Sequence, residues 1–342
     1  MKKRRTTIHD IAEKLNITAS TVSRALHDHP RISKATKQVV LKTAERLHYQ
    51  PNHIAAALRN GKSNVIGIIV PTADRSFFST VVRGIEEIAN AANYNVMICQ
   101  THDLHEKEVA AVEALLNARV DGIIASIAKE TENFDHFRKL KVKGIPLVLF
   151  DRSNDELDVS NVIIDDHLGA YKAVEHLIQQ GCKRIAHFTS QKKVSIYRER
   201  YRGYREALES YRMPFDASLV IESHLQLQDG RQSMKKLLSM SKPPDGVFSS
   251  SDYGAMGALQ VLKERGIIAP KQIAIVGFSN ESFTSFSEPT ITTVDQHSMR
   301  MGNAAAEIFL EQILTGNNVF VPKKTILKPD LIIRKSSLRN GA

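Results

Sequence analysis

The sequence predicts a two-part fold: a small all-α domain at the N-terminus, followed by an α/β core of two lobes built on parallel sheets. Residues 7–47 carry apolar side chains at helical spacing, which is typical of short amphipathic helices. From residue 65 onward, short apolar runs alternate with helical stretches. That alternation indicates parallel strands covered by helices on both faces. A chain of 342 residues is long enough for two or three domains.

The composition is that of an ordinary soluble protein, with 42% hydrophobic and 25% charged residues. No apolar run approaches the roughly 20 residues needed to span a bilayer. The basic N-terminal segment has no apolar stretch behind it, so it is not a secretory signal. The two cysteines, Cys99 and Cys182, lie far apart in the sequence. We therefore expect a reduced, cytoplasmic protein.

The first helix is predicted to begin after Thr7, which is a plausible N-cap, with Asp10 near the positive end of the helix dipole. One face of this helix is apolar, formed by Ile8, Ile11, Ala12 and Leu15. Asn16 interrupts the pattern, and asparagine tolerates the left-handed backbone that a tight turn requires.

A second helix is predicted to follow, with Thr18 as its N-cap. Its apolar side is formed by Val22, Ala25 and Leu26, and its other side by Ser20, Thr21, Ser23 and Arg24. Hydroxyl groups beside an arginine suit phosphates and guanine edges in a DNA major groove. The same pattern also fits a small helical hairpin with a solvated polar face.

The distribution of charge favours the DNA-binding interpretation over that of a solvated helical hairpin. Residues 1–60 carry 12 Lys+Arg against 4 Asp+Glu, whereas the remaining residues carry 35 against 33. Nearly all of the formal charge of +10 therefore lies in the N-terminal part. A basic block on a small helical domain is the electrostatic footprint of a protein that binds the phosphate backbone.

A third helix is predicted to begin after Ser33, a further N-cap, and to end before Pro51. Lys34, Thr36 and Lys37 at its start are placed to reach phosphates, or are simply exposed. The following segment, HIAAALRNGKS, is short and rich in alanine. A helix of this length is marginal alone in water, so we expect it to be helical only when something holds it.

The larger part is predicted to contain seven strands and six helices. The strands are Val65–Val70, Val96–Cys99, Gly122–Ala125, Pro146–Phe150, Arg184–Phe188, Gly246–Phe248 and Ile273–Gly277. The helices are Thr80–Ala92, Lys107–Ala118, Leu168–Gln180, Tyr197–Tyr211, Asp229–Ser239 and Asp252–Arg265. This span is too long for one comfortable sheet, so we expect two α/β lobes with a cleft between them.

Ligands of such sheets bind beyond the carboxyl ends of the strands, and polar residues follow several of the predicted strands. Carboxylates beside an arginine, with an aromatic ring nearby, suit the hydroxyls and the apolar face of a sugar. The alternative for any one of these residues is that it caps a helix, as Asp252 is placed to do. The candidates are Asp74, Ser76, Phe77, Ser126, Asp151, Arg152, Arg200, Ser251, Asp252, Ser279 and Asn280.

Two segments, Thr7-Ile8-x-Asp10-Ile11-Ala12 and Ser20-Thr21-Val22-Ser23-Arg24-Ala25-Leu26, resemble the headpiece of the lactose/galactose-repressor family of bacterial transcription regulators. The resemblance covers essentially the whole chain, through to LKPDLIIRKSS at its end. Asn16 stands where the family usually has glycine. The resemblance implies a helix-turn-helix headpiece, a hinge helix, and a periplasmic-binding-protein-like core.

The resemblance also implies domain bounds. The headpiece would be residues 1–50, the hinge helix or linker 51–62, and the effector-binding and dimerisation core 63–342. Within the core, the N-lobe would comprise about 63–161 and 292–321, and the C-lobe about 162–291 and 322–338.

For DNA, the resemblance implies that Arg24 reads a guanine and that Leu58 of the hinge enters the minor groove as an apolar wedge. The alternative for Leu58 is an ordinary linker leucine that packs on the core. Ala56 stands where the family often has arginine. The predicted DNA-contacting residues are Thr7, Thr18, Ala19, Ser20, Thr21, Ser23, Arg24, Thr36, Asn52, Ala55 and Leu58.

For the effector, the family's contacting positions fall on Asp151, Arg200, Asp252 and Ser279, with Gln296 weaker. Ser279 replaces an aspartate that is usual in the family. Leu225 stands where an aromatic residue often stacks on the ligand. The complete set that we predict is Asp74, Phe77, Ser126, Asp151, Arg200, Asp252, Ser279 and Gln296.

The expected function is a homodimeric transcription regulator, a repressor by class, that reads a near-palindromic operator under the control of a carbohydrate effector. The alternatives are a solute-binding protein, which would need export, and a sugar-modifying enzyme. No nucleophile–base pair or phosphate loop supports an enzyme, because Ala56 occupies the glycine position that Gly61-Lys62-Ser63 would require. His102 and His105 could bind a metal, but surface histidines on a loop are commoner. We expect no cofactor and no metal.

Overall fold

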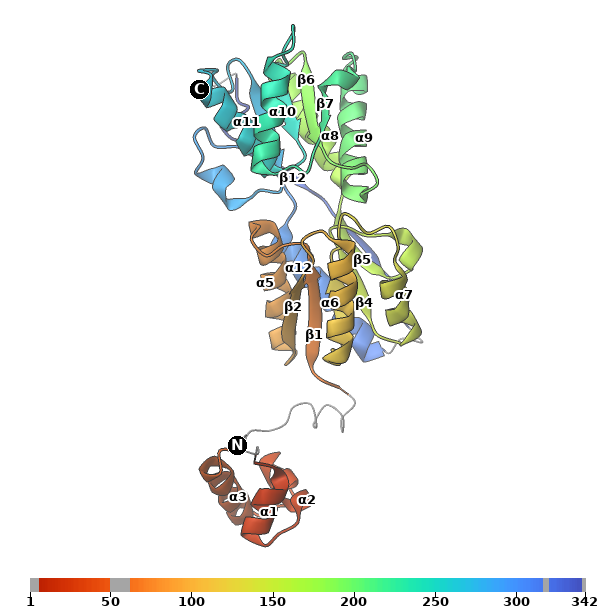
Figure 1. The fold of residues 1–342 in the computed structure, drawn as a ribbon, viewed down its shortest axis with the longest axis vertical. Coiled ribbons are helices and arrows are strands. Elements are labelled where there is room, and N and C mark those ends of the chain that lie inside the picture. Colours follow the sequence, from red (N-terminus) through yellow and green to blue (C-terminus); the bar gives the residue numbers. More distant parts are fainter. Residues whose placement is uncertain (1–5, 50–61, 316–319, 340–342) are drawn as a thin grey trace. The chain divides into compact units, whose positions relative to one another are not determined.

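The computed structural model describes residues 6–49, 62–315 and 320–339, and the chain divides into two compact units, Met1–Ser63 and Asn64–Ala342 (Figure 1). The predicted hinge residues Asn52, Ala55 and Leu58 lie outside the described residues. No helix in the described ranges is both long enough and apolar enough to cross a membrane.

The first unit contains the three predicted helices, α1 (Ile8–Leu15), α2 (Ala19–Leu26) and α3 (Lys34–Arg46). Thr18 and Ser33 cap α2 and α3, each accepting a backbone N–H bond from three residues further on. Asn16 adopts the expected left-handed conformation, with φ 50°. The apolar faces of the helices form one small core, made of Ile11, Ala12, Val22, Ala25, Val40 and Ala44.

The second unit is built on two sheets, as the alternating pattern predicted, and each sheet has six strands. The first sheet has the order β11-β5-β4-β3-β1-β2 and the second the order β12-β10-β9-β8-β6-β7. All described strand pairs are parallel except β10 with β12. The strands of the first sheet are β1 (Val65–Val70), β2 (Asn95–Gln100), β3 (Gly122–Ala125), β4 (Leu147–Phe150), β5 (Ser160–Ile164) and β11 (Lys324–Leu327). Those of the second are β6 (Ile185–Thr189), β7 (Val220–Glu222), β8 (Gly246–Ser249), β9 (Ala274–Phe278), β10 (Thr292–Asp295) and β12 (Asp330–Ile332).

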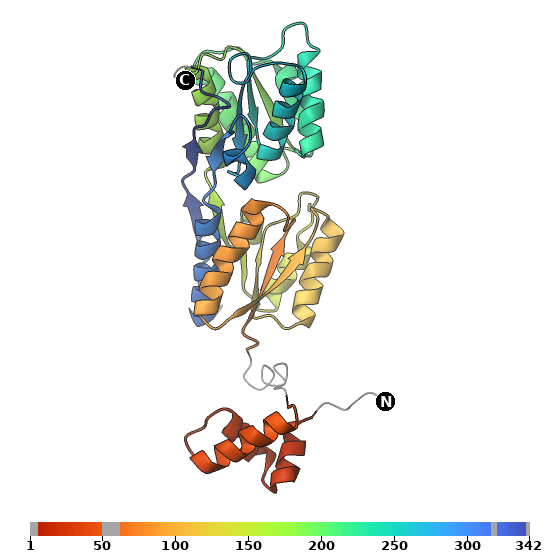
Figure 2. The same cartoon turned by 90° about the vertical axis from the view of Figure 1, so that its left-hand side faces the viewer.

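Helices cover both faces of each sheet, and the lobes take their cores from this layering (Figure 2). In the N-lobe, α5 (Ser76–Ala91) packs beside α12 (Ser298–Thr315) on one face. The other face carries α6 (His105–Asn117) and α7 (Asp135–Val142). In the C-lobe, the helices pack in two pairs. These pairs are α8 (Asp166–Gln179) with α9 (Ser195–Ser210), and α10 (Leu227–Leu238) with α11 (Asp252–Glu264).

The predicted lobe boundaries at 161, 292 and 321 need correction, because each crossing lies at the end of a strand rather than at its start. Residues 160–164 form β5 in the N-lobe sheet, residues 292–295 form β10 in the C-lobe sheet, and residues 324–327 form β11 back in the N-lobe sheet. Each of these strands is completed within one sheet, and the chain then passes to the other lobe through the polar segment that follows the strand. The described chain therefore crosses near residues 165, 296 and 328.

Several elements were not predicted. The strands β5 (SNVII), β7 (VIE), β10 (TTVD), β11 (KTIL) and β12 (DLI) are short and mix polar with apolar residues, so they lack the apolar run that marked the predicted strands. Helix α7 has only eight residues and is rich in charge. Helix α12 has eighteen residues, and its run of alanine, isoleucine and leucine was a sufficient signal that the sequence analysis did not use.

Candidate functional site

The second helix of the N-terminal unit presents an exposed polar side. Thr18 Oγ1 lies 2.8 Å from Ser20 Oγ and 2.9 Å from Thr21 Oγ1, so the hydroxyl groups form one cluster at the helix N-terminus. Arg24 is exposed and forms no ion pair with any described residue. Backbone N–H groups, hydroxyls and a guanidinium on one helix are the donors that contact phosphates and base edges.

Three of the predicted DNA-contacting residues also serve the fold. The backbone N–H and the hydroxyl of Thr7 both donate to Asp10 at the start of α1, at 2.6 and 2.7 Å. Thr36 donates its backbone N–H to the Ser33 cap, and Thr18 caps α2. Their assignment to DNA remains a prediction.

A hydrogen-bonded network at the carboxyl ends of the second sheet brings together three of the predicted effector residues. Arg200, on α9, donates to Gln296 Oε1 at 3.2 Å, and Gln296 Nε2 donates to Ser279 Oγ at 2.9 Å. The Arg200 guanidinium also donates to the Ser250 carbonyl and lies 3.7 Å from the centre of the Phe278 ring. The arginine is 3% exposed, so its charge is held by protein groups rather than by water.

Asp166 is the ionic partner of Arg200, and the sequence analysis missed it. Its carboxylate accepts a bond from Arg200 Nε at 2.7 Å. Burial raises the pKa of Asp166 to about 7, against the opposing effect of the nearby Arg200. Asp166 follows β5 directly, so the polar-residue-after-strand rule would have found it if β5 had been predicted.

The N-lobe side of the site is formed by residues that follow β3 and β4. Ser126 Oγ donates to Asp151 at 3.4 Å, and Arg152 pairs with both Asp151 and Asp103. Burial raises the pKa of Asp151, although Arg152 and Arg200 both act to lower it.

Asp252 belongs to a second group of contacts and is not a helix cap. The N-cap of α11 is Ser251. The Asp252 carboxylate instead accepts the Thr293 hydroxyl at 2.7 Å and the Glu281 backbone N–H at 2.8 Å. Burial raises the pKa of Asp252 to about 7. The predicted alternative of a capping role is therefore wrong.

The remaining candidates, Asp74 and Phe77, lie outside the network. Asp74 accepts the Thr72 hydroxyl, and Phe77 is buried edge-to-face against Phe78. Close to them, the backbone N–H and hydroxyl of Ser76 both donate to Glu281 of the C-lobe. This contact joins the two lobes directly.

A cavity of about 690 Å³ adjoins the network, and residues of both lobes line it. It has the size of pockets that hold small ligands. Of the predicted effector residues only Asp151 lines it; Asp166 and Arg152 line it as well. Two buried donors nearby, Arg152 Nε and Ser250 Oγ, have no hydrogen-bond partner among the described residues.

A basic helix-turn-helix unit ahead of a two-lobed, periplasmic-binding-protein-like core defines a class of DNA-binding transcription regulators. The protein-family model described as "Bacterial regulatory proteins, lacI family" matches residues 7–52. The model described as periplasmic binding proteins and sugar binding domain of LacI family matches residues 63–335. The chain belongs to the lacI family of bacterial regulators.

Individual relatives match over most of their length. The ribose operon repressor of Halalkalibacterium halodurans is 32% identical over 90% of this chain and 90% of its own. The transcriptional repressor PurR of Haemophilus influenzae is 31% identical over 96% of this chain and 98% of its own. A solved LacI family regulator from Enterococcus faecium with bound ribose is 27% identical, with a TM-score of 0.73 over 81% of this chain and 100% of that chain.

Proposed function

We propose that this protein is a homodimeric transcription repressor whose affinity for its operator is set by a carbohydrate bound between the lobes. The observation that carries the effector proposal is the buried polar group around Arg200, beside which Ser250 Oγ has no hydrogen-bond partner among the described residues and Arg152 Nε has only a long ionic contact with Asp151, at 3.7 Å. Buried donors without partners are rare in proteins, and a ligand that supplies acceptors explains them. The hydroxyl oxygens of a sugar are acceptors of this kind.

The carboxylates complete a sugar-binding set. Asp151 and Asp166 both line the cavity, and each can accept bonds from sugar hydroxyls. Two relatives agree with this class: one is named a ribose operon repressor, and another was solved with ribose bound.

For DNA, we propose that α2 enters the major groove and that Leu58 of the linker enters the minor groove at the operator centre. Arg24 suits a guanine, while Ala19 and Ser20 are small and limited to a thymine methyl or water-mediated contacts. Two such units on a dimer would read a near-palindrome. Closure of the lobes on the effector would change how the two linkers pair, a coupling typically on the order of 1–3 kcal/mol.

The test is a thermal-shift screen of the purified chain against pentoses, hexoses, disaccharides, sugar phosphates and nucleobases. We expect one carbohydrate class to raise the Tm. The same compound should change affinity for a duplex selected from a random pool by about 5- to 150-fold. Asp151→Asn should weaken the effect of the sugar without changing the affinity for DNA in its absence.

A screen in which no carbohydrate shifts the Tm would contradict the effector proposal. A sugar that shifts wild type and Asp151→Asn equally would remove the assigned site. The DNA-binding proposal is tested separately, by measuring operator affinity at increasing salt concentration. The affinity must fall steeply as the salt concentration rises.

A further inference from the structure

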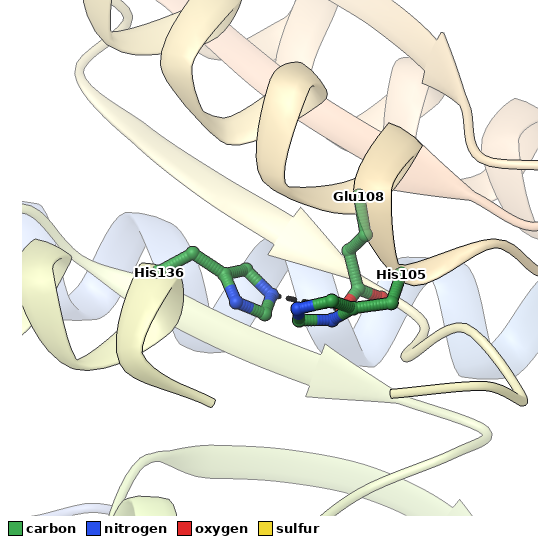
Figure 3. Close-up of side chains that lie close together, drawn as sticks. All are labelled: His105, Glu108 and His136. Carbon is green, nitrogen blue, oxygen red and sulfur yellow. Dashed lines mark hydrogen bonds and ion pairs between the residues drawn. The ribbon is translucent and has the colours of Figure 1, made fainter. Parts of the chain in front are cut away.

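We propose that His105, Glu108 and His136 form a binding site for a divalent transition-metal ion of the zinc type in the N-lobe. The three side chains point toward one another from two helices (Figure 3). One ligand atom from each lies within 4.8 Å of the others. All three residues belong to the second unit, and none of them takes part in the Arg200 network.

Local structure explains why the three meet. His105 and Glu108 lie three residues apart at the start of α6, so they share one face of that helix. His136 lies in the first turn of α7, which packs beside α6. The imidazoles of His105 and His136 are arranged edge-to-face, with centroids 5.3 Å apart.

The carboxylate of Glu108 is the centre of the cluster. It is 0% exposed, and among the described residues its only ion-pair partner is His136. Oε1 accepts His136 Nε2 at 2.8 Å and the Thr131 hydroxyl at 2.7 Å, while Oε2 accepts the Ala128 N–H. Burying a carboxylate away from Lys and Arg is costly, and a cation held between it and two imidazoles offsets that cost.

The donor set and spacing suit zinc. Two imidazole nitrogens and one carboxylate oxygen are common zinc ligands, leaving a fourth position for water. Bonds of about 2.1 Å in a tetrahedral arrangement place ligand atoms about 3.4 Å apart. The metal would therefore replace the proton between His136 and Glu108 and separate that pair slightly.

The surroundings provide the outer support that metal ligands need. Thr131 and the Ala128 N–H hold the carboxylate in place, and His105 Nδ1 lies 3.4 Å from Thr131 Oγ1. Ala128 and Thr131 also line the cavity between the lobes. A bound ion would thus hold one wall of that cavity.

The experiment is calorimetric titration of Zn²⁺ into the untagged, chelator-dialysed full chain. We expect one ion per chain and a Tm that rises with Zn²⁺ concentration. His105→Asn, at a partly exposed position, should weaken binding at least about tenfold. His102→Asn is the matched control, because His102 is exposed, lies outside the cluster and has φ 53°, which asparagine tolerates; it should bind as wild type does.

X-ray absorption at the zinc edge supplies a measurement that needs no variant: two imidazoles and oxygen ligands are expected. Absence of stoichiometric binding, equal affinity in His105→Asn, equal loss in His102→Asn, or a ligand count without two imidazoles would each overturn the site.

Discussion

At the scale of single residues, the sequence was most informative where one side chain acts locally. Thr18, Ser33 and Asn16 were predicted from the chemistry of helix caps and left-handed turns, and the structure confirms all three. Partners across the fold were not predictable in this way. Glu281 binds Ser76 from 205 positions away, and no local pattern in the sequence links them.

The residues of the candidate effector site also differ in how well the sequence predicted them. Arg200 and Ser279 were selected both as polar residues after strands and by resemblance, Gln296 by resemblance alone, and the three meet in one network. Asp166 was missed because its strand, β5, was not predicted. Asp74 and Phe77 also follow a predicted strand but lie apart from the network, because Asp74 accepts a bond from Thr72 in the turn after β1 and Phe77 packs against Phe78 in the core.

The raised pKa of Asp166 predicts that the stability of the folded protein depends on pH. With a folded pKa of about 7 against an ordinary value of 3.8, the folded state retains a proton that the unfolded chain releases. The contribution of this carboxyl to the free energy of unfolding is fully present below about pH 4 and is lost as the pH rises through 7. The stability difference between wild type and Asp166→Asn should fall by about 2–3 kcal/mol from pH 5 to pH 8.

Denaturant unfolding of both proteins at the two pH values measures this difference. Asparagine keeps an oxygen to accept the Arg200 bond, so the comparison isolates the titration. A difference that is the same at pH 5 and pH 8 would show that Asp166 does not titrate as inferred.

At the scale of elements, helices of strong amphipathic pattern were placed to within a few residues, whereas short strands and the charged helix α7 were not. The pattern of α2 is specific enough to argue function. Its apolar side packs in the headpiece core through Val22 and Ala25, which leaves the polar side with Ser20 and Arg24 exposed.

Replacing Arg24 by alanine should lower affinity for a selected operator by about 1–3 kcal/mol and relax its preference at one base pair. Arg46→Ala is the matched control: it removes one exposed charge from the last turn of α3. That change should weaken specific and non-specific binding alike. Fluorescence anisotropy with selected and scrambled duplexes measures both; an unchanged specificity ratio in Arg24→Ala would exclude base readout by this residue.

At the scale of the whole molecule, the N-lobe sheet has an uncovered edge. Strand β2 ends the sheet order, and the adjacent side chains Met97 and Ile98 are 41% and 47% exposed. Because neighbouring residues of a strand point to opposite faces, apolar side chains are partly exposed on both faces at this edge. Helix α5 contacts β2 in the fold, and we expect the contacts of the proposed dimer to come from helices such as the segment 79–92, nearly all of which belongs to α5.

Ile98→Asp should therefore weaken self-association at least about tenfold, because it places a charge in an apolar contact. Operator affinity should fall with it, since two linked headpieces bind more tightly than one, while sugar binding should persist. Val142→Asp, at a side chain that is 89% exposed on α7, is the control. Sedimentation velocity across a concentration series measures the dimer; identical profiles for wild type and Ile98→Asp would place the interface elsewhere.

The crossings between the lobes also determine the order in which parts of the chain can fold during synthesis. The N-lobe sheet is finished by β11 at residues 324–327, and the C-lobe sheet by β12 at 330–332. The ribosome must therefore release the chain through residue 327 before the N-lobe, and through residue 332 before the C-lobe, can acquire its last strand. The core of the first unit lies within residues 11–44, so this unit can fold while synthesis continues, before either lobe of the second unit is complete.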